Sequence, residues 1–513
     1  MANDDPTLPD DIDTAHRQIR ELAETLRQQI ALNQKLQHQL ELLLRQRFGK
    51  KGEKIDPDQL LLFAQEIMAE VEPAEAQKPE AADKPKTGGH GRKPLPASLP
   101  RKRIVHDVSL EDRACPECGE TRQSIGEDVR EQLEYVPASL LVLQHVRPKY
   151  ACKSCEAHVI IAPRLPEPIE KGLPGPGLLA HVAVSKYADH LPLYRLEGIF
   201  KRQGVELTRS TMCDWMAECA GLLGAIVKEM KRRILLSKAI RSDDTPVTVQ
   251  DFQGKGSKTG RFWVYLGDRD HPYIVYDYTP DRSGIGPENF LANYTSGYLQ
   301  SDAYAGYNGI HDRGIIEVGC WAHARRKFYD ARTSDTVRSH AAIAWISRLY
   351  EVEKEAREQK FDDAMRHVLR QEQSRPVLES FEAWLRVEAT KALPKSPIGE
   401  AISYTLSNWI ALNRYVEADY LSIDNNASEN AIRPIAVGRK NWLFCGSDRG
   451  GQTAATLMSL TSSCKALGVE PFAYLRDLLE RVSTHPNSLI DELLPDRWAK
   501  LKAEAQAMID RKG

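Results

Sequence analysis

The chain has 513 residues, a net charge of −2 and a hydrophobic fraction of 42%. This length exceeds what one hydrophobic core usually holds, so we expect several domains. No run approaches the roughly 18 apolar residues that a membrane-spanning helix needs, and the acidic first residues differ from a signal peptide, so the sequence predicts a cytoplasmic protein.

Residues 1–55 are predicted to form a coiled-coil helix. Alternating spacings of three and four residues mark its seam: Ile19, Leu22, Leu26, Gln29, Asn33, Leu36, Leu40 and Leu43. Asn33 falls at an a position, where a buried amide can fix register and oligomeric state. We expect a homo-oligomer, most simply a parallel dimer; the alternative is an amphipathic helix that packs on its own chain.

Residues 56–103 are predicted to be a basic linker rich in Pro and Gly. The stretch 83–103 contains seven Lys or Arg and one acid, Asp83, and residues 71–100 lack aromatic side chains. Such a composition cannot bury enough apolar area to offset the entropy of the chain. We therefore expect a positively charged tether here.

Residues 104–170 are predicted to form a small zinc-binding β module. Two Cys-x-x-Cys turns supply the four thiolates of a structural Zn²⁺ site: Cys115, Cys118, Cys152 and Cys155. The 33 residues between the pairs include a strand-like stretch, 136–150, that can bring the two turns together. A redox-active dithiol is the alternative to zinc, and His158 is a candidate replacement ligand.

Residues 171–237 are predicted to form a helical DNA-binding module. The pattern predicts helices over 178–187, 193–203 and 208–223, with a break at Gly204 and with Thr208 or Ser210 capping the last helix. A helix, a short turn and a capped helix match the helix-turn-helix motif, and they match a generic helical hairpin equally well.

Residues 238–480 are predicted to form an α/β catalytic domain with a ribonuclease-H-like sheet. Short β-branched or aromatic segments predict strands over 246–250, 261–267, 273–278, 298–301 and 315–319, the first three of them antiparallel. We expect Asp243 at the start of the first strand, Asp302 at the end of the fourth, and Glu429 on a helix that begins near Asn426 after an Asn-rich turn able to cap it. Three carboxylates that meet can bind two Mg²⁺ or Mn²⁺ ions, which cut phosphodiesters.

The 127-residue step from Asp302 to Glu429 is too long for a compact core and predicts an insertion. Its pattern over about 331–415 is helical, with large apolar side chains for a buried face: Trp345, Leu349, Phe361, Leu369, Phe381 and Trp384. Residues 481–513 are predicted to form a C-terminal helical tail.

Cationic residues flank the acidic ones in sequence and predict contacts with DNA phosphates, with one Trp for stacking on an unpaired base. They are Arg325, Arg326, Lys327, Arg433, Arg439, Lys440 and Trp442. The alternative is ordinary surface charge.

Six motifs resemble those of the IS66-family insertion-sequence transposases over nearly the whole chain. They are the segments 242–247, 301–307, 320–328, 424–429, 432–434 and 438–442. The resemblance implies that Asp243, Asp302 and Glu429 are a DDE triad, with Asp302 bridging both ions. It also implies a bacterial protein, nucleoid-associated when bound to DNA, and small accessory proteins from the same element. The family's first motif usually reads His-Ala-Asp-Glu-Thr; here Ser242 and Asp244 flank Asp243, and the shorter Asp244 alters a carboxylate beside a metal ligand.

Cys320 and His323 form a Cys-x-x-His pair at the end of the fifth predicted strand. Similar transposases carry such a pair beside the active site, where it either braces the insertion or assists strand processing. The alternative is a packed Cys and a helix-capping His.

The function expected from these features is DNA transposition. Water activated on one metal ion cuts at an element end, and the 3′ hydroxyl then attacks target DNA at the same site. Two alternatives remain open: a non-catalytic DNA-binding repressor, and a stand-alone ribonuclease-H-like nuclease. Joining of a donor end to target DNA separates the nuclease from the transposase.

Overall fold

The computed structural model describes residues 16–17, 19–29, 32, 140–147, 149–150, 160–161, 163, 166–170, 172–251 and 256–510. The chain divides into two compact units, one of Met1–Pro73 with Ala162–Gly513 and one of Ala74–Ile161. In the second unit β1 (Lys149–Tyr150) pairs antiparallel with β2 (Ile160–Ile161). The four predicted zinc ligands, Cys115, Cys118, Cys152 and Cys155, lie outside the described residues, as do His158 and the basic linker.

The predicted coiled-coil seam is described only in part. Residues 19–29 are helical, and the seam side chains Ile19, Leu22 and Leu26 are exposed. Asn33 and the later seam positions lie outside the described residues. Self-association through this helix therefore stays a prediction.

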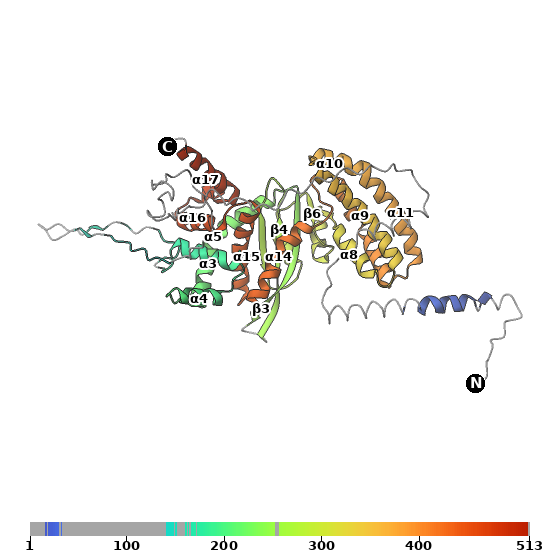
Figure 1. Ribbon diagram of the computed structural model, residues 1–513, viewed down its shortest axis with the longest axis horizontal. Helices are drawn as coiled ribbons and strands as arrows, with labels where there is room; N and C mark the ends of the chain where they lie inside the picture. The colour runs from blue at the N-terminus through green and yellow to red at the C-terminus, as the bar shows by residue number, and fades with distance from the viewer. Residues whose placement is uncertain are drawn as a thin grey trace, which may run out of the picture. The chain divides into compact units, whose positions relative to one another are not determined.

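A mixed five-stranded sheet forms the centre of the first unit, with the strand order β5-β4-β3-β6-β7 (Figure 1). The strands are β3 (Ala239–Asp251), β4 (Gly256–Leu266), β5 (Ile274–Thr279), β6 (Tyr298–Gln300) and β7 (Ile316–Val318). Strands β3, β4 and β5 are antiparallel, whereas β6 is parallel to β3 and β7 is parallel to β6. The predicted antiparallel strands followed by two more are confirmed.

The position of Asp243 within its strand was predicted wrongly. Strand β3 begins at Ala239 rather than at Pro246, so Asp243 lies inside the strand and pairs with Val264 of β4. Strand β6 pairs only with Ala239 to Arg241, so among the described residues the other edge of β3 has no partner strand where Pro246 occurs. Proline, which cannot donate a hydrogen bond, is tolerated at such an edge.

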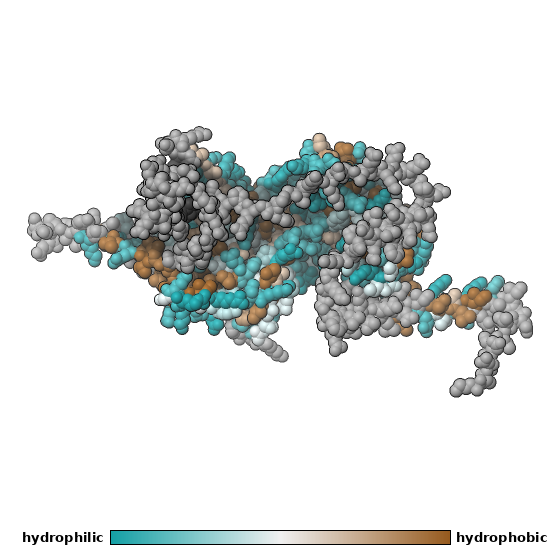
Figure 2. Space-filling model, viewed as in Figure 1, coloured by the Kyte–Doolittle hydropathy of each residue, from teal (hydrophilic) through white to brown (hydrophobic). Residues whose placement is uncertain are grey.

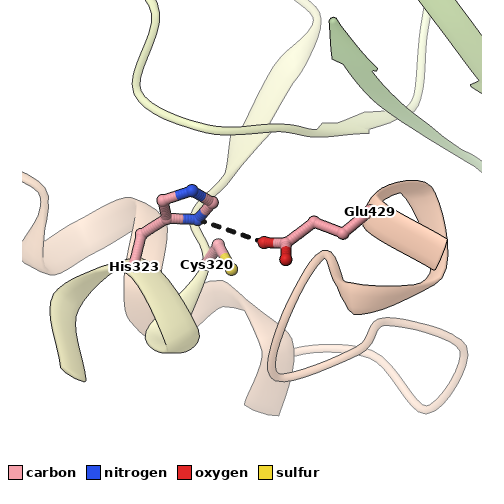
Figure 3. A group of neighbouring side chains, drawn as sticks. All are labelled: Cys320, His323 and Glu429. Carbon is pink, nitrogen blue, oxygen red and sulfur yellow. Dashed lines mark ion pairs between the residues drawn. The ribbon is translucent and has the colours of Figure 1, made fainter. Parts of the chain in front are cut away.

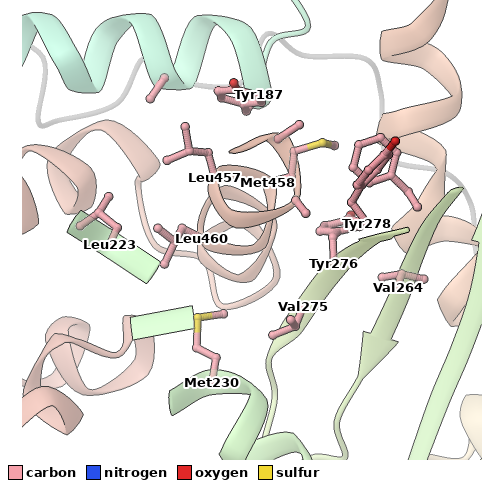
Figure 4. Packing of buried hydrophobic residues seen from close by; sticks show 14 of the residues in the cluster. Tyr187, Leu223, Met230, Val264, Val275, Tyr276, Tyr278, Leu457, Met458 and Leu460 are labelled. Atoms are coloured by element: carbon pink, nitrogen blue, oxygen red, sulfur yellow. The ribbon is translucent and has the colours of Figure 1, made fainter. Parts of the chain in front are cut away.

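Helices from both ends of the chain pack together with the sheet. They are α3 (Pro176–Tyr187), α4 (Leu193–Arg202), α5 (Arg209–Ile234), α15 (Asp448–Ala466), α16 (Pro471–Arg481) and α17 (Pro495–Asp510). Helix α15 contacts both α5 and β5. Figure 4 shows Leu457 and Leu460 of α15 lying close to Leu223 of α5, with Val275 of β5 facing the same core.

Helix α5 confirms its predicted start but not its predicted end. The Thr208 side chain accepts a hydrogen bond from the backbone N–H of Thr211 at 3.2 Å, which caps the helix. The helix then continues past Leu223 to Ile234, because apolar residues recur at helical spacing and are buried in the core, as at Met230.

The predicted helical insertion is confirmed and has its own core. Between β7 and the return to the sheet lie α8 (Trp321–Ala331), α9 (Thr336–Glu358), α10 (Asp363–Leu369), a π-helical turn (Arg370–Ser374), α11 (Arg375–Lys391), α12 (Pro397–Ser407) and α13 (Trp409–Asn413). Phe381 is fully buried among the rings of Trp321, Trp345, Trp384 and Trp409. The chain then returns in α14 (Asn426–Trp442), which packs against β3 and β4.

The described surface is mixed in polarity. On the face shown in Figure 2, hydrophobic residues form separate patches among hydrophilic ones. Within the described parts of the chain, no helix combines the length and the apolar character needed to span a membrane.

Candidate functional site

The three predicted acids lie on, or directly after, three neighbouring elements around the central strand of the sheet. Asp243 is in β3, Asp302 follows the end of β6 by two residues, and Glu429 is in the first turn of α14. Strands β3 and β6 are parallel neighbours, with Arg241 opposite Gln300. The chain therefore leaves β6 on the side where β3 carries Asp243.

Electrostatics links these acids. Burial, the main cause, and the negative charges of Asp302, Asp244 and Glu429 together raise the pKa of Asp243 to about 7, although the hydrogen bond from the Asp244 backbone N–H acts in the opposite direction. Burial also raises the pKa of Asp302. The negative charge of Asp244 raises it too, whereas His323 and Arg282 lower it. A cation placed among these carboxylates would relieve both the repulsion and the loss of hydration.

The acids do not, however, all point to one place. Among the described residues, the donor atoms of Asp243, Asp302 and Glu429 do not form a group within 4.8 Å of one another, whereas those of Cys320, His323 and Glu429 do. Glu429 Oε1 lies 3.9 Å from Nδ1 of His323. The Glu429 carboxylate thus lies close to His323 of helix α8 and does not converge with Asp243 and Asp302 on one point.

Two cavities open beside these residues. One, of about 600 Å³, has Asp243 and Arg433 in its lining, and the other, of about 480 Å³, extends to Tyr350 and Lys354 of α9. Four residues line both cavities: His323, Arg326, Asn426 and Glu429. Two of the predicted DNA-binding cations, Arg326 and Arg433, therefore flank the Asp243 and Glu429 carboxylates.

The other predicted DNA-binding residues differ in their surroundings. Arg325 lines the second cavity, Lys440 is exposed, and Lys327 Nζ lies 4.5 Å from the ring centre of Tyr404. Arg439 donates from Nη1 to Thr245 Oγ1 at 2.9 Å and to the Pro246 carbonyl at 2.6 Å, so it fastens α14 to β3. Trp442 is half-buried and packs against the core.

Cys320 and His323 are placed by the first turn of α8. Cys320 is the N-cap residue and is 2% exposed, and the backbone N–H of Asn425 donates to its Sγ at 3.2 Å. Nδ1 of His323 is buried and has no hydrogen-bond partner. Figure 3 shows the His323 ring facing the Glu429 carboxylate, with Cys320 beside them.

A buried polar network that sequence reasoning missed holds the acid-bearing segments together. Asn425 donates from Nδ2 to the Ser242 carbonyl at 2.8 Å and accepts at Oδ1 from the Ser428 hydroxyl at 2.9 Å. The Ser242 hydroxyl is 2.9 Å from the hydroxyl of Tyr307, which follows Asp302. The Asn-rich turn was expected to cap α14; its N-cap residue, Asn425, makes no side-chain cap bond and joins α14 to β3 instead.

The altered first motif also has a defined environment. Asp244 is almost fully buried and pairs with Arg261 at 2.7 Å and with Arg282 at 2.8 Å. Arg282 lies 4.0 Å from the ring centre of Tyr304, two residues after Asp302. The shorter side chain at position 244 is therefore held on both oxygens, and its backbone N–H donates to Asp243 Oδ1 at 2.8 Å.

The sequence matches four models of one family. The model described as "Transposase IS66 family" matches residues 171–453, and the zinc-finger binding domain of transposase IS66 matches residues 112–156, which contain all four Cys-x-x-Cys cysteines. "Transposase C of IS166 homeodomain" matches residues 35–104, and the IS66 C-terminal element matches residues 459–495.

Similar proteins occur in Sinorhizobium fredii (strain NBRC 101917 / NGR234). The uncharacterized protein y4qI is 36% identical over 482 residues, which cover 89% of this chain and 87% of that protein. The uncharacterized protein y4hP is 32% identical over 441 residues, which cover 80% and 78% of the two chains. The similarity thus extends over most of both relatives.

Proposed function

Since the chain belongs to the IS66 transposase family, we propose that it binds the ends of a DNA element and catalyses strand cleavage and transfer with Asp243, Asp302 and Glu429. The observation that carries this proposal is the cluster of carboxylates beside a cavity with cationic walls. Asp243 and Asp302 are partly buried, which is the main cause that raises the pKa of each carboxyl, and the negative charge of Asp302 contributes to the raised pKa of Asp243. Arg326 and Arg433 offer positive charge on the same cavity.

The donor set fits a hard divalent cation. Mg²⁺ and Mn²⁺ prefer carboxylate oxygens, and two bound ions would supply an activated water and stabilise the leaving oxygen. Asp243 and Asp302 would hold these ions from the sheet, and Glu429 would complete the site from α14. Arg326 and Arg433 would attract the DNA backbone, whose phosphates need a positive partner near so many carboxylates.

We further propose a ribonuclease-H-like fold for the catalytic domain, residues 238–480. The strand order β5-β4-β3-β6-β7, with three antiparallel strands and two parallel ones, supports it. Residues 171–237 would contact element ends, and residues 1–55 would join two or more copies. The match to a zinc-finger model supports a structural Zn²⁺ held by the four Cys-x-x-Cys thiolates.

The proposal is tested by incubating the purified chain with labelled element ends, Mg²⁺ and a target plasmid. The wild-type chain should yield ends joined to the plasmid. Asp243→Asn keeps the shape of the side chain but removes its charge, so it should abolish cleavage and joining while end binding persists. Cleavage retained by this variant would disprove the triad assignment.

Two comparisons sharpen this test. Asp270→Asn removes an exposed carboxylate from the turn after β4 and should leave both reactions unchanged. Cleavage without any joined product would favour a nuclease, and end binding without cleavage by the wild-type chain would favour a repressor.

A further inference from the structure

Cys320 and His323, which the proposed two-ion chemistry does not use, form a cluster of mixed donors with Glu429. One donor atom from each residue lies within 4.8 Å of the others, and the cluster joins the start of α8 to the first turn of α14. A thiol, an imidazole and a carboxylate are the three ligand types that proteins use for zinc. Mg²⁺, in contrast, has little affinity for sulfur.

The surroundings of the sulfur suit a thiolate ligand. Burial raises the pKa of the Cys320 thiol to about 11, whereas the backbone N–H of Asn425, which donates to Cys320 Sγ at 3.2 Å, acts in the opposite direction. Cys320 is also the N-cap residue of α8, and the N-terminus of a helix favours negative charge. A metal ion bound to the sulfur would itself stabilise the charged form against the effect of burial.

The imidazole is likewise arranged for a ligand. Nδ1 of His323 is buried without a hydrogen-bond partner, although an unsatisfied buried nitrogen is costly. It lies 3.9 Å from Glu429 Oε1, close to the separation of about 3.3–3.8 Å that zinc bonds of about 2.0–2.3 Å impose on two ligands of a tetrahedral ion. Small side-chain rotations would bring all three donors to bonding distance.

We propose that Cys320, His323 and Glu429 bind a divalent ion of the zinc type, distinct from the Cys-x-x-Cys site and from the two proposed Mg²⁺ ions. Both cavities border His323 and Glu429, so water or a DNA phosphate oxygen can reach the fourth position. On binding, the Cys320 thiol loses its proton to solvent, and the thiolate and carboxylate together balance the ion's two charges.

This ion would also control where Glu429 points. With the ion bound, the Glu429 carboxylate is held toward α8, where the structure already places it. Without it, the side chain can turn toward Asp243. Metal binding by this cluster does not depend on the proposed strand transfer, although Glu429 would serve both the cluster and the proposed Mg²⁺ site.

The test is the zinc content of the full chain after equilibration with excess Zn²⁺ and desalting. The wild-type chain should hold one zinc ion per chain more than Cys320→Ser. Cys464→Ser is the matched control, because it alters another buried cysteine, on α15 and outside the cluster, and it should retain the wild-type content. His323→Ala, at a half-exposed position, should lose the same ion, so the result does not depend on how Cys320→Ser folds.

A second measurement identifies the ligands. Added Co²⁺ should give a near-ultraviolet sulfur-to-cobalt absorption that is weaker in Cys320→Ser than in wild type, since the Cys-x-x-Cys thiolates absorb in both chains, and Glu429→Gln should weaken the affinity by about tenfold or more. Equal zinc content in the wild-type, Cys320→Ser and His323→Ala chains would overturn the inference. That outcome leaves strand transfer untouched, since its own test is the loss of cleavage in Asp243→Asn.

Discussion

The first unit contains two large hydrophobic cores that differ in what they join. The first unites α3 to α5, the sheet and the C-terminal helices, so it ties together segments from across the sequence. The second consists of α8 and the helices of the insertion, and from the strands it takes Ala239 and Val318. The first core therefore joins segments that are far apart in the sequence, whereas the second is formed mostly by one continuous segment.

The candidate site lies where these cores meet. Strand β3 carries Asp243, and α14 carries Glu429; both elements contribute to the first core, α14 through Ile432 and Ile435. Cys320 and His323 instead begin α8 of the second core. Because no single apolar core spans the site, polar contacts across the junction must fix its geometry.

The strongest test of two separate cores is Phe381→Ala. Phe381 is fully buried among four tryptophan rings, so truncation should lower the free energy of unfolding by about 3–5 kcal/mol. Hydrogen exchange should then show lost protection in α8 to α13 while α5 and α15 stay protected. Leu457→Ala, in the first core, should reverse this pattern. Equal loss of protection in both regions after Phe381→Ala would contradict the separation.

Asn425→Ala tests the polar junction. It leaves the Ser242 carbonyl without its side-chain donor and removes the Ser428 contact, which should cost about 1–3 kcal/mol of unfolding free energy. Since Asn425 orients the start of α14, cleavage should also fall by about 10–100-fold and need more Mg²⁺. Ser428→Ala, which breaks one of these bonds and leaves the tie to β3, should show little change in Mg²⁺ dependence. An unchanged Mg²⁺ dependence for Asn425→Ala would rule out the positioning role.

Sequence reasoning predicted the sheet, the insertion and the helix of Glu429 because each has a local pattern. Alternation and turn residues mark the strands, and helical spacing marks α9 and α11. The largest error in the sheet concerned Pro246, which was taken as a strand boundary; β4 also begins earlier than predicted, at Gly256 rather than at Arg261. The prediction about Pro246 was wrong because β4 pairs with β3 on both sides of this proline, whereas β6 pairs only with the start of β3. The local sequence around Pro246 does not reveal how far β6 extends.

The fine geometry of the site could not be predicted for a similar reason. The acids were identified by their motifs, but the contact of Asn425 with Ser242 joins residues 183 positions apart. The Glu429 carboxylate lies 3.9 Å from Nδ1 of His323, which belongs to another helix. The available signal was a polar residue near two of the acids, Ser242 directly before Asp243 and Asn425 four residues before Glu429, although polar residues there equally suit solvent exposure.

The smallest effect is expected at the rim of the first core, at Asp448. Its carboxylate accepts from Tyr278 at 2.6 Å and from Lys258 at 2.7 Å, and hydrogen bonding to Lys258 is the main cause that lowers its pKa. A lowered carboxyl pKa stabilises the fold fully above the ordinary value of 3.8, and this stabilisation is lost as the pH falls through the lowered folded value. Urea unfolding below pH 4 should therefore show a slightly flatter pH dependence for Asp448→Asn than for wild type. The change should be small because the side chain is half-exposed and apolar packing holds α15 in place.

A pH dependence as steep in Asp448→Asn as in wild type would show that this contact contributes nothing to stability. A loss of unfolding free energy as large as that of Asn425→Ala would instead show that polar contacts stabilise both regions to the same degree.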